Sequence, residues 1–247
     1  MAYERQATVQ NPALIVYLID VSASMASPLG DRSRIEVVSE ALQSTISQML
    51  ARSTRGSSIF PRYRIAMFAY SDAVYDILDG VRSIEELKDG FPELTTLRTT
   101  QTSKAFVAAE RLLRQEWAKL RQGPAPLICH LTDGEYTGDD PEPVARNLQA
   151  MLLPDGAALV ENIYISDDIL PEAIEDPYKW SGIFPSTRLA SDYARKLRDM
   201  SSPLPESYRS MLTNSGYGLE PGCLMLLPGT NRELVALGYQ MSASTRL

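Results

Sequence analysis

Residues 13–20, Ala-Leu-Ile-Val-Tyr-Leu-Ile-Asp, form a continuous apolar run that ends in an acid. A strand that is apolar on both sides must be covered on both faces, as in a parallel sheet between two layers of helices. Two later runs share the pattern, because 125–135 ends in Thr-Asp-Gly-Glu and 157–168 ends in two aspartates. We therefore predict an α/β fold that is doubly wound, with a mostly parallel central sheet and helices on both faces.

Between these strands the apolar residues repeat at helical spacing, which predicts helices over 34–50, 103–121 and 141–152. The segments 64–72 and 73–80 resemble two strands joined by a tight turn. Such a pair is antiparallel, so the sequence predicts one antiparallel strand at an edge of the sheet.

The last part of the chain is less regular. Residues 169–189 contain three prolines and Trp180, which is typical of an ordered excursion. The patterns that follow predict two helices, a strand and a closing helix, over 192–200, 204–212, 223–229 and 231–244. A lone strand needs the main sheet for partners. We therefore expect a single domain over 1–247, with a core at 13–168 and a C-terminal elaboration at 169–247.

Composition excludes several classes of function. The 247 residues include 24 Lys and Arg against 31 Asp and Glu, a net charge of −7, which disfavours nucleic acids and anionic membranes as partners. The start of the chain lacks the apolar core of a signal peptide, and no run approaches the roughly 20 apolar residues that span a bilayer. These features predict a cytoplasmic protein.

The chain has one histidine, His130, and two cysteines, Cys129 and Cys223. This scarcity excludes zinc sites built from histidine or cysteine, and it excludes catalysis by paired histidines. His130 and Cys129 lie inside an apolar run, so we expect both in a core strand. A bound metal would have to use oxygen ligands.

Three polar groups fall where ligands bind in open α/β sheets, beyond the carboxyl ends of the strands. They are Asp20, Ser22 and Ser24 after the first strand, Thr99-Thr100-Gln101-Thr102 before the second long helix, and Asp133 after the strand that contains His130. Hydroxyl and carboxylate oxygens suit a hard divalent cation: Mg²⁺ first, with Mn²⁺ or Ca²⁺ as alternatives.

Simpler roles exist for the same residues. The serines suit loops and helix caps, the threonines suit an N-cap, and Asp133-Gly134 suits a turn. A group of acids either forms a rim that attracts cations and basic partners or is simply a solvated surface; its members are Asp31, Glu135, Asp139, Asp140 and Glu142. We expect Tyr178 and Trp180 to fasten the 169–189 excursion to the core; the alternative is an aromatic anchor for a partner.

The order D-x-S-x-S, then T, then D resembles the metal-ion-dependent adhesion site of the von Willebrand factor A (VWA) family, and the likeness extends from about residue 13 to the end. It implies that Ser22, Ser24 and Thr100 coordinate Mg²⁺ directly, while Asp20 and Asp133 act mostly through water. Many members have a glycine pair before the threonine, whereas this chain has Leu97-Arg98-Thr99. The ligand is therefore open between Thr99, Thr100 and Thr102, with Thr100 favoured.

Among subfamilies the chain is most similar to bacterial cytosolic VWA proteins of the tellurium-resistance type, whose relatives act beside kinases, phosphatases or MoxR-type ATPases. The resemblance implies a non-enzymatic module that binds a partner's carboxylate through the metal, in a bacterial signalling or stress-response complex. Partner specificity is expected in 169–220.

Two rival functions stay open. One is a phosphatase or phosphotransferase that uses Asp20 as nucleophile, although such enzymes carry a second aspartate where this chain has Ser22. The other is a structural subunit with a vestigial metal site.

Overall fold

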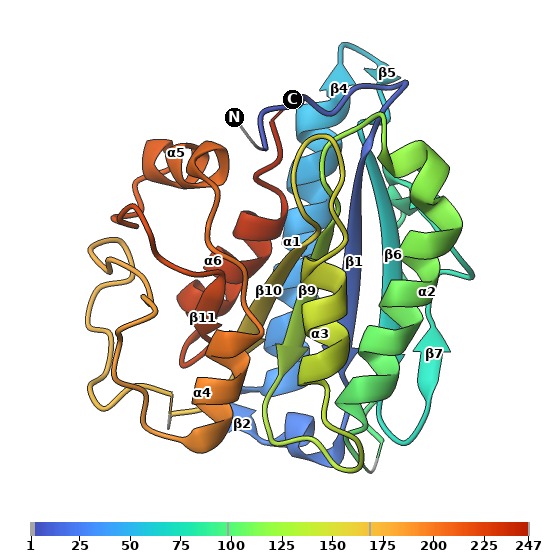
Figure 1. Cartoon of the computed structure of the whole chain (residues 1–247). Coiled ribbons are helices and arrows are strands. Elements are labelled where there is room, and N and C mark those ends of the chain that lie inside the picture. Colours follow the sequence, from blue (N-terminus) through green and yellow to red (C-terminus); the bar gives the residue numbers. More distant parts are fainter. Residues whose placement is uncertain (1–2, 98, 168, 247) are drawn as a thin grey trace.

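The computed structural model describes residues 3–97, 99–167 and 169–246 (Figure 1). Within these residues the main sheet has the strand order β11-β10-β9-β1-β6-β7, and β8 also pairs with β6. The strands are β1 Ala13–Asp20, β2 Pro28–Leu29, β3 Arg32–Ser33, β4 Thr54–Arg55, β5 Ser58–Ile59, β6 Tyr63–Tyr70, β7 Val74–Asp76, β8 Arg82–Ser83, β9 Leu127–Thr132, β10 Leu159–Tyr164 and β11 Leu226–Pro228. The helices are α1 Arg34–Ser53, α2 Thr102–Leu120, α3 Glu142–Gln149, α4 Asp192–Asp199, α5 Glu206–Asn214 and α6 Arg232–Ser242, with 3₁₀ turns at Ala23–Ala26 and Ile84–Leu87.

The first strand of the chain lies in the middle of the sheet. β1 pairs in parallel with β6 on one side and with β9 on the other, and β10 and β11 continue the parallel part. The chain thus runs from β1 outward to β6 and then returns past β1 to β9. This reversal makes the carboxyl ends of β1 and β9 the topological switch point, where open α/β sheets bind ligands.

Both faces of the sheet are covered by helices (Figure 1). Alternate residues of β1 face opposite layers, as the period of a strand requires. Ile15, Tyr17 and Ile19 join the core that includes buried residues of α1 and α6. Leu14, Val16 and Leu18 join the core under α2 and α3. The doubly wound, mostly parallel fold predicted from the apolar runs is confirmed.

The antiparallel edge is shorter than the sequence predicts. β7 pairs antiparallel with β6, as expected, but it ends at Asp76 instead of continuing to residue 80. The carboxylate of Asp76 accepts hydrogen bonds from the amides of Leu78 and Gly80, and Asp79 and Gly80 have φ values of 54° and 97°. A strand cannot accommodate such backbone angles. The chain turns here, and β8 then adds a second short antiparallel segment.

The C-terminal part contributes to the same sheet, because β11 pairs with β10. Trp180 packs partly buried against the core, as expected, whereas Tyr178 is 53% exposed and stacks on Tyr217. The second terminal acid of the run 157–168, Asp168, lies outside the described residues. The division into one domain over 1–247 stays a prediction. No helix among the described residues is both long and apolar enough to cross a membrane.

Cys129 and His130 lie in β9 and are buried, as predicted. His130 Nε2 lies 2.7 Å from the hydroxyl of Tyr70, and its Nδ1 lies 2.8 Å from Oδ1 of Asn162. Burial lowers the pKa of His130 to about 4, so the ring is neutral at pH 7. Both cysteines are free thiols in the interior.

Candidate metal centre

Three loops meet beyond the carboxyl ends of β1 and β9. The segment after β1 is held to the loop before α2, since the amide of Leu97 donates to the carbonyl of Val21 at 2.5 Å. The carbonyl of Thr100 accepts hydrogen bonds from the amide and the hydroxyl of Thr137, at 2.7 and 2.9 Å. Thr137 belongs to the loop after β9, so the polar groups predicted from three separate segments share one edge of the sheet.

Asp20 ends β1 and is fully buried. Its Oδ1 accepts a hydrogen bond from the amide of Ser22, and its Oδ2 accepts one from the hydroxyl of Thr132, both at 2.8 Å. Burial raises the pKa of Asp20 to about 6, although these hydrogen bonds act in the opposite direction. Asp20 is therefore mostly ionised at pH 7, with both of its oxygens engaged.

Asp133 follows β9, and its side chain has no exposed surface. Its Oδ1 accepts a hydrogen bond from the hydroxyl of Ser24 at 2.7 Å, and its Oδ2 accepts one from Nη1 of Arg34 at the same distance. The hydroxyls of Ser22 and Ser24 lie 3.0 Å apart. Hydrogen bonds thus join Asp20, Ser22, Ser24 and Asp133 in one continuous group.

The three candidate threonines differ in their surroundings. Thr102 is the first residue of α2 and is fully buried, and the amide of Thr99 is bonded to the hydroxyl of Ser71 at 3.1 Å. Thr100 is 8% exposed and is the one whose backbone contacts the loop after β9. These contacts involve the backbone of Thr100 and Thr99, and the buried hydroxyl of Thr102 has no hydrogen-bond partner among the described residues, so Thr100 stays the predicted ligand.

The donor set fits a hard divalent cation. Each carboxylate oxygen of Asp20 and Asp133 accepts one hydrogen bond and keeps a further lone pair, and the hydroxyls of Ser22 and Ser24 also keep lone pairs for a cation. The carboxylates therefore orient the hydroxyls and supply charge. In the parts of the chain that the structure describes, no cluster of three or more His, Cys, Asp or Glu forms a metal site. A metal at this edge would depend on Ser22, Ser24 and Thr100.

Two residues of the site escaped the sequence analysis, Thr137 and Arg34, and Thr132 was noted only as part of the Thr-Asp-Gly-Glu group, without a role of its own. A lone hydroxyl in a loop has no distinctive spacing, so Thr137 had no detectable pattern. Arg34 did have one, because a basic side chain in the first turn of a helix is unfavourable next to the helix dipole unless a carboxylate compensates it.

The predicted acidic rim is largely paired. Lys196 of α4 donates to Asp140 at 2.7 Å and to Glu142 at 3.2 Å, and Arg232 of α6 lies 3.4 Å from Asp31. Asp139 and Glu135 are exposed. The rim is therefore a mixed surface of both charge signs over much of its length.

Fold and site together define a doubly wound α/β protein. At its topological switch point two buried aspartates accept hydrogen bonds from serine and threonine hydroxyls. Residues 15–135, just under half of the chain, match the family model described as von Willebrand factor type A domain. This match supports a VWA domain in that part of the chain. A search of curated proteins gives no match.

The chain is also similar to solved structures. Proximal thread matrix protein 1 from the mussel byssus, in a second crystal form, matches with 13% identity and a TM-score of 0.53, over 98% of this chain and 48% of that one. The same mussel protein with a zinc-occupied MIDAS motif gives 14% identity, a TM-score of 0.47 and coverage of 64% and 37%. Manganese-loaded TRAP protein of Plasmodium vivax matches with 14% identity and a TM-score of 0.47, over 94% of this chain and 74% of that one.

At these identities the likeness concerns the fold alone, and the first of the three matches supports it. The chain spans about half the length of the mussel protein.

Proposed function

We propose that the chain is a VWA-type interaction module that binds a divalent cation, Mg²⁺ before Mn²⁺ or Ca²⁺. Ser22, Ser24 and Thr100 would hold the ion directly, and Asp20 and Asp133 would act through hydrogen bonds and water. The observation that supports this most strongly is the continuous hydrogen-bonded group of Asp20, Ser22, Ser24 and Asp133, which brings two hydroxyls and two carboxylates together at one edge of the sheet. When bound, the ion would supply a positively charged coordination position for a carboxylate oxygen of a protein partner.

The same geometry argues against a phosphotransferase. A nucleophilic aspartate needs an accessible oxygen, but Asp20 is fully buried and both of its oxygens accept hydrogen bonds. The residue two positions later is Ser22, which cannot act as general acid or base near neutral pH. We therefore propose that the module is not an enzyme.

The setting of the module is part of the proposal. By resemblance we place it in the bacterial cytoplasm, in a signalling or stress-response complex with a kinase, a phosphatase or a MoxR-type ATPase. The segment 169–220 would then contribute to the choice of partner. It contains a surface pocket of about 680 Å³ lined in part by Leu170, Ile174 and Trp180.

Calorimetric titration of Mg²⁺ and Mn²⁺ into EDTA-treated protein tests the metal. We expect one saturable site in the wild type, its loss in Asp20→Ala, and its retention in Asp140→Ala. Asp140 is a suitable control because it is an acid near the same edge that is paired with Lys196 and lies outside the site. Equal binding by the wild type and Asp20→Ala would contradict the assignment.

The carboxylate acceptor has its own test. A blocked peptide with a single glutamate, acetyl-Ala-Glu-Ala-amide, should shift amide resonances around residues 20–24 and 133–137 in Mg²⁺ and leave them unchanged in EDTA. The glutamine analogue of the peptide should give no shifts in either condition. Identical shifts with both peptides would refute carboxylate recognition, and shifts that persist in EDTA would favour a structural subunit with a vestigial site.

A further inference from the structure

Arg34 is the positively charged residue inside the candidate metal centre. It is the first residue of α1, and its Nη1 donates to Oδ2 of Asp133 at 2.7 Å. The Arg34 side chain is 24% exposed, whereas that of Asp133 is fully inaccessible. A carboxylate without access to water needs a compensating partner. Arg34 therefore neutralises Asp133 in the protein without metal.

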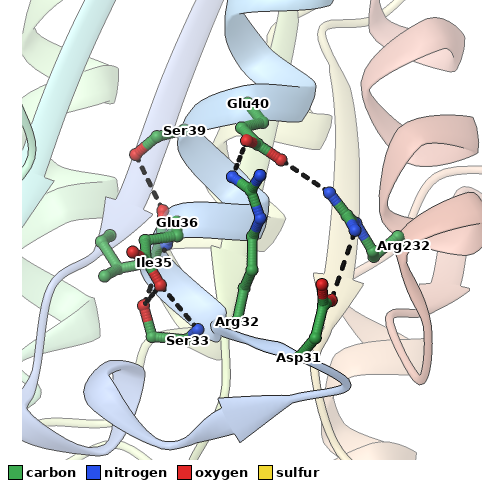
Figure 2. A network of polar contacts seen from close by, with 8 residues as sticks. All are labelled: Asp31, Arg32, Ser33, Ile35, Glu36, Ser39, Glu40 and Arg232. Atoms are coloured by element: carbon green, nitrogen blue, oxygen red, sulfur yellow. Dashed lines mark hydrogen bonds and ion pairs between the residues drawn. The ribbon is translucent and has the colours of Figure 1, made fainter.

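Polar contacts anchor the start of α1 on both sides of position 34 (Figure 2). The amide of Ser33 donates to the carboxylate of Glu36 at 2.8 Å, and the amide of Glu36 donates back to the hydroxyl of Ser33, which completes a capping box. Glu40 of α1 pairs with both Arg32 and Arg232, and Arg232 also pairs with Asp31 (Figure 2). These contacts join the turn before α1, α1 itself and α6.

The two aspartates of the centre differ in how their charge is compensated. Asp20 is negative at pH 7 and is hydrogen bonded to neutral donors, the Ser22 amide and the Thr132 hydroxyl. The carboxylate of Asp133 forms an ion pair with Arg34 at 2.7 Å. The hydroxyls contribute no charge. A divalent cation would therefore meet a net charge of about one negative unit, and it would do so beside a guanidinium.

The contact between Arg34 and Asp133 leaves part of the guanidinium unused. Nη1 makes the hydrogen bond, whereas the buried Nε–H has no hydrogen-bond partner among the described residues. A buried donor without an acceptor is costly. The buried Nε–H is out of reach of a partner, whereas an incoming carboxylate at the centre would supply the negative charge that the centre lacks.

We propose that Arg34 sets the metal affinity of this centre: by neutralising Asp133 it keeps divalent-cation binding weak until an acidic group of a partner supplies the missing charge. This inference rests on the proposed metal-dependent function and adds a regulatory residue to it. Metal and partner then bind together, each raising the affinity for the other by the same factor.

The test is calorimetric titration of Mn²⁺ into EDTA-treated wild type, Arg34→Gln, Arg34→Lys and Arg32→Gln. We expect Arg34→Gln to bind Mn²⁺ about tenfold more tightly than the wild type, because it removes one unit of repulsion from a divalent ion. Arg34→Lys keeps the charge and should bind like the wild type. Arg32→Gln is the matched control, since Arg32 lies two positions away but pairs with Glu40.

Thermal unfolding in EDTA gives a readout that needs no metal. Arg34→Gln should lower the metal-free Tm because buried Asp133 loses its partner, and saturating Mn²⁺ should raise the Tm more than in the wild type. If the glutamine variant does not fold, Arg34→Met, which keeps the aliphatic stem, takes its place in both measurements.

The outcomes separate the two hypotheses. If the wild type binds Mn²⁺ and Arg34→Gln binds equally or more weakly, the role of Arg34 is wrong and the metal site stands. If Arg32→Gln or Arg34→Lys tightens binding as much as Arg34→Gln does, a specific charge effect of Arg34 is wrong as well. If neither the wild type nor Arg34→Gln binds Mn²⁺, the proposed function fails and the inference fails with it.

Discussion

Both ends of the sheet bury aspartates, but the hydrogen-bond donors around these carboxylates differ between the two ends. At the carboxyl end Asp20 accepts one hydrogen bond from a hydroxyl and one from the amide of Ser22, and Asp133 accepts one from Ser24 and one from Arg34. At the opposite end Asp155 is 5% exposed, and its partners among the described residues are the backbone amides of Glu4, Arg5 and Ala125, at 2.9–3.0 Å.

The two ends differ in whether the hydrogen-bond donors keep lone pairs that a cation can use. A backbone amide that donates its proton has no remaining capacity for a cation, so Asp155 closes its end of the sheet and fastens the N-terminal segment to it. A hydroxyl that donates its proton keeps lone pairs. The carboxyl end therefore retains ligating oxygens after every carboxylate is satisfied, which is the property that a binding site needs.

The largest expected contrast is between the stability effects of the two ends. Asp155→Ala removes a charged acceptor from three amides and should lower the free energy of unfolding by about 4 kcal/mol, with Mg²⁺ binding of the folded protein unchanged. Urea unfolding in EDTA measures the first quantity and calorimetry the second. Loss of metal binding by folded Asp155→Ala would break the distinction between the two ends.

The pH dependence of stability tests the burial of Asp20 at the carboxyl end. Burial raises the pKa of Asp20 to about 6, above its value near 3.8 in the unfolded chain, so the folded protein binds the proton more tightly. In EDTA, protonated Asp20 therefore stabilises the folded protein below about pH 4. This stabilisation is lost as the pH rises through 6, which lowers the free energy of unfolding by about 3 kcal/mol.

Urea unfolding between pH 4 and 7, in wild type and Asp20→Asn, measures this contribution. The neutral ring of His130, with its pKa lowered to about 4, acts in the opposite direction but is common to both proteins and cancels in their difference. A difference that does not vary with pH would mean that Asp20 is not destabilised by burial.

The smallest contrast concerns two threonines two positions apart, Thr100 before α2 and Thr102 at its start. Thr100→Val should weaken Mn²⁺ binding about tenfold, the least that removing even an outer partner of a metal usually costs. Thr102→Val makes the same chemical change in a fully buried residue at the start of α2 and should leave the affinity unchanged. A reversed result in calorimetry would move the ligand assignment from Thr100 to Thr102.

Much of the fold could be predicted because it follows from burial. The apolar run of β1 required cover on both faces, and the structure provides it through α1 and α6 on one side and α2 and α3 on the other. The predicted end of the edge strand was wrong, because the strand stops at Asp76. Its end depends on a turn formed by Asp76, Asp79 and Gly80, which an apolar pattern does not reveal.

The candidate site was predictable in part for a related reason. Asp20, Ser22, Ser24 and Asp133 have a characteristic order at strand ends, and parallel strands bring those ends together. Arg34 belongs to a helix, and its contact with Asp133 depends on how that helix packs. The sequence separates these two residues by 99 positions, and no local pattern spans such a distance.

The central position of β1 has a consequence for biosynthesis. β1 is the first strand of the sheet to leave the ribosome, yet Asp20 receives its hydrogen bond from Thr132, which is 112 positions later in the chain. At translation rates of 5–20 residues per second, roughly 6 to 22 seconds pass between the two. During that interval the nascent chain already contains Asp20, Ser22 and Ser24, but it has neither Asp133 nor β9 beside them. A cation site that uses both aspartates can therefore be completed only after β9 and Asp133 have been made.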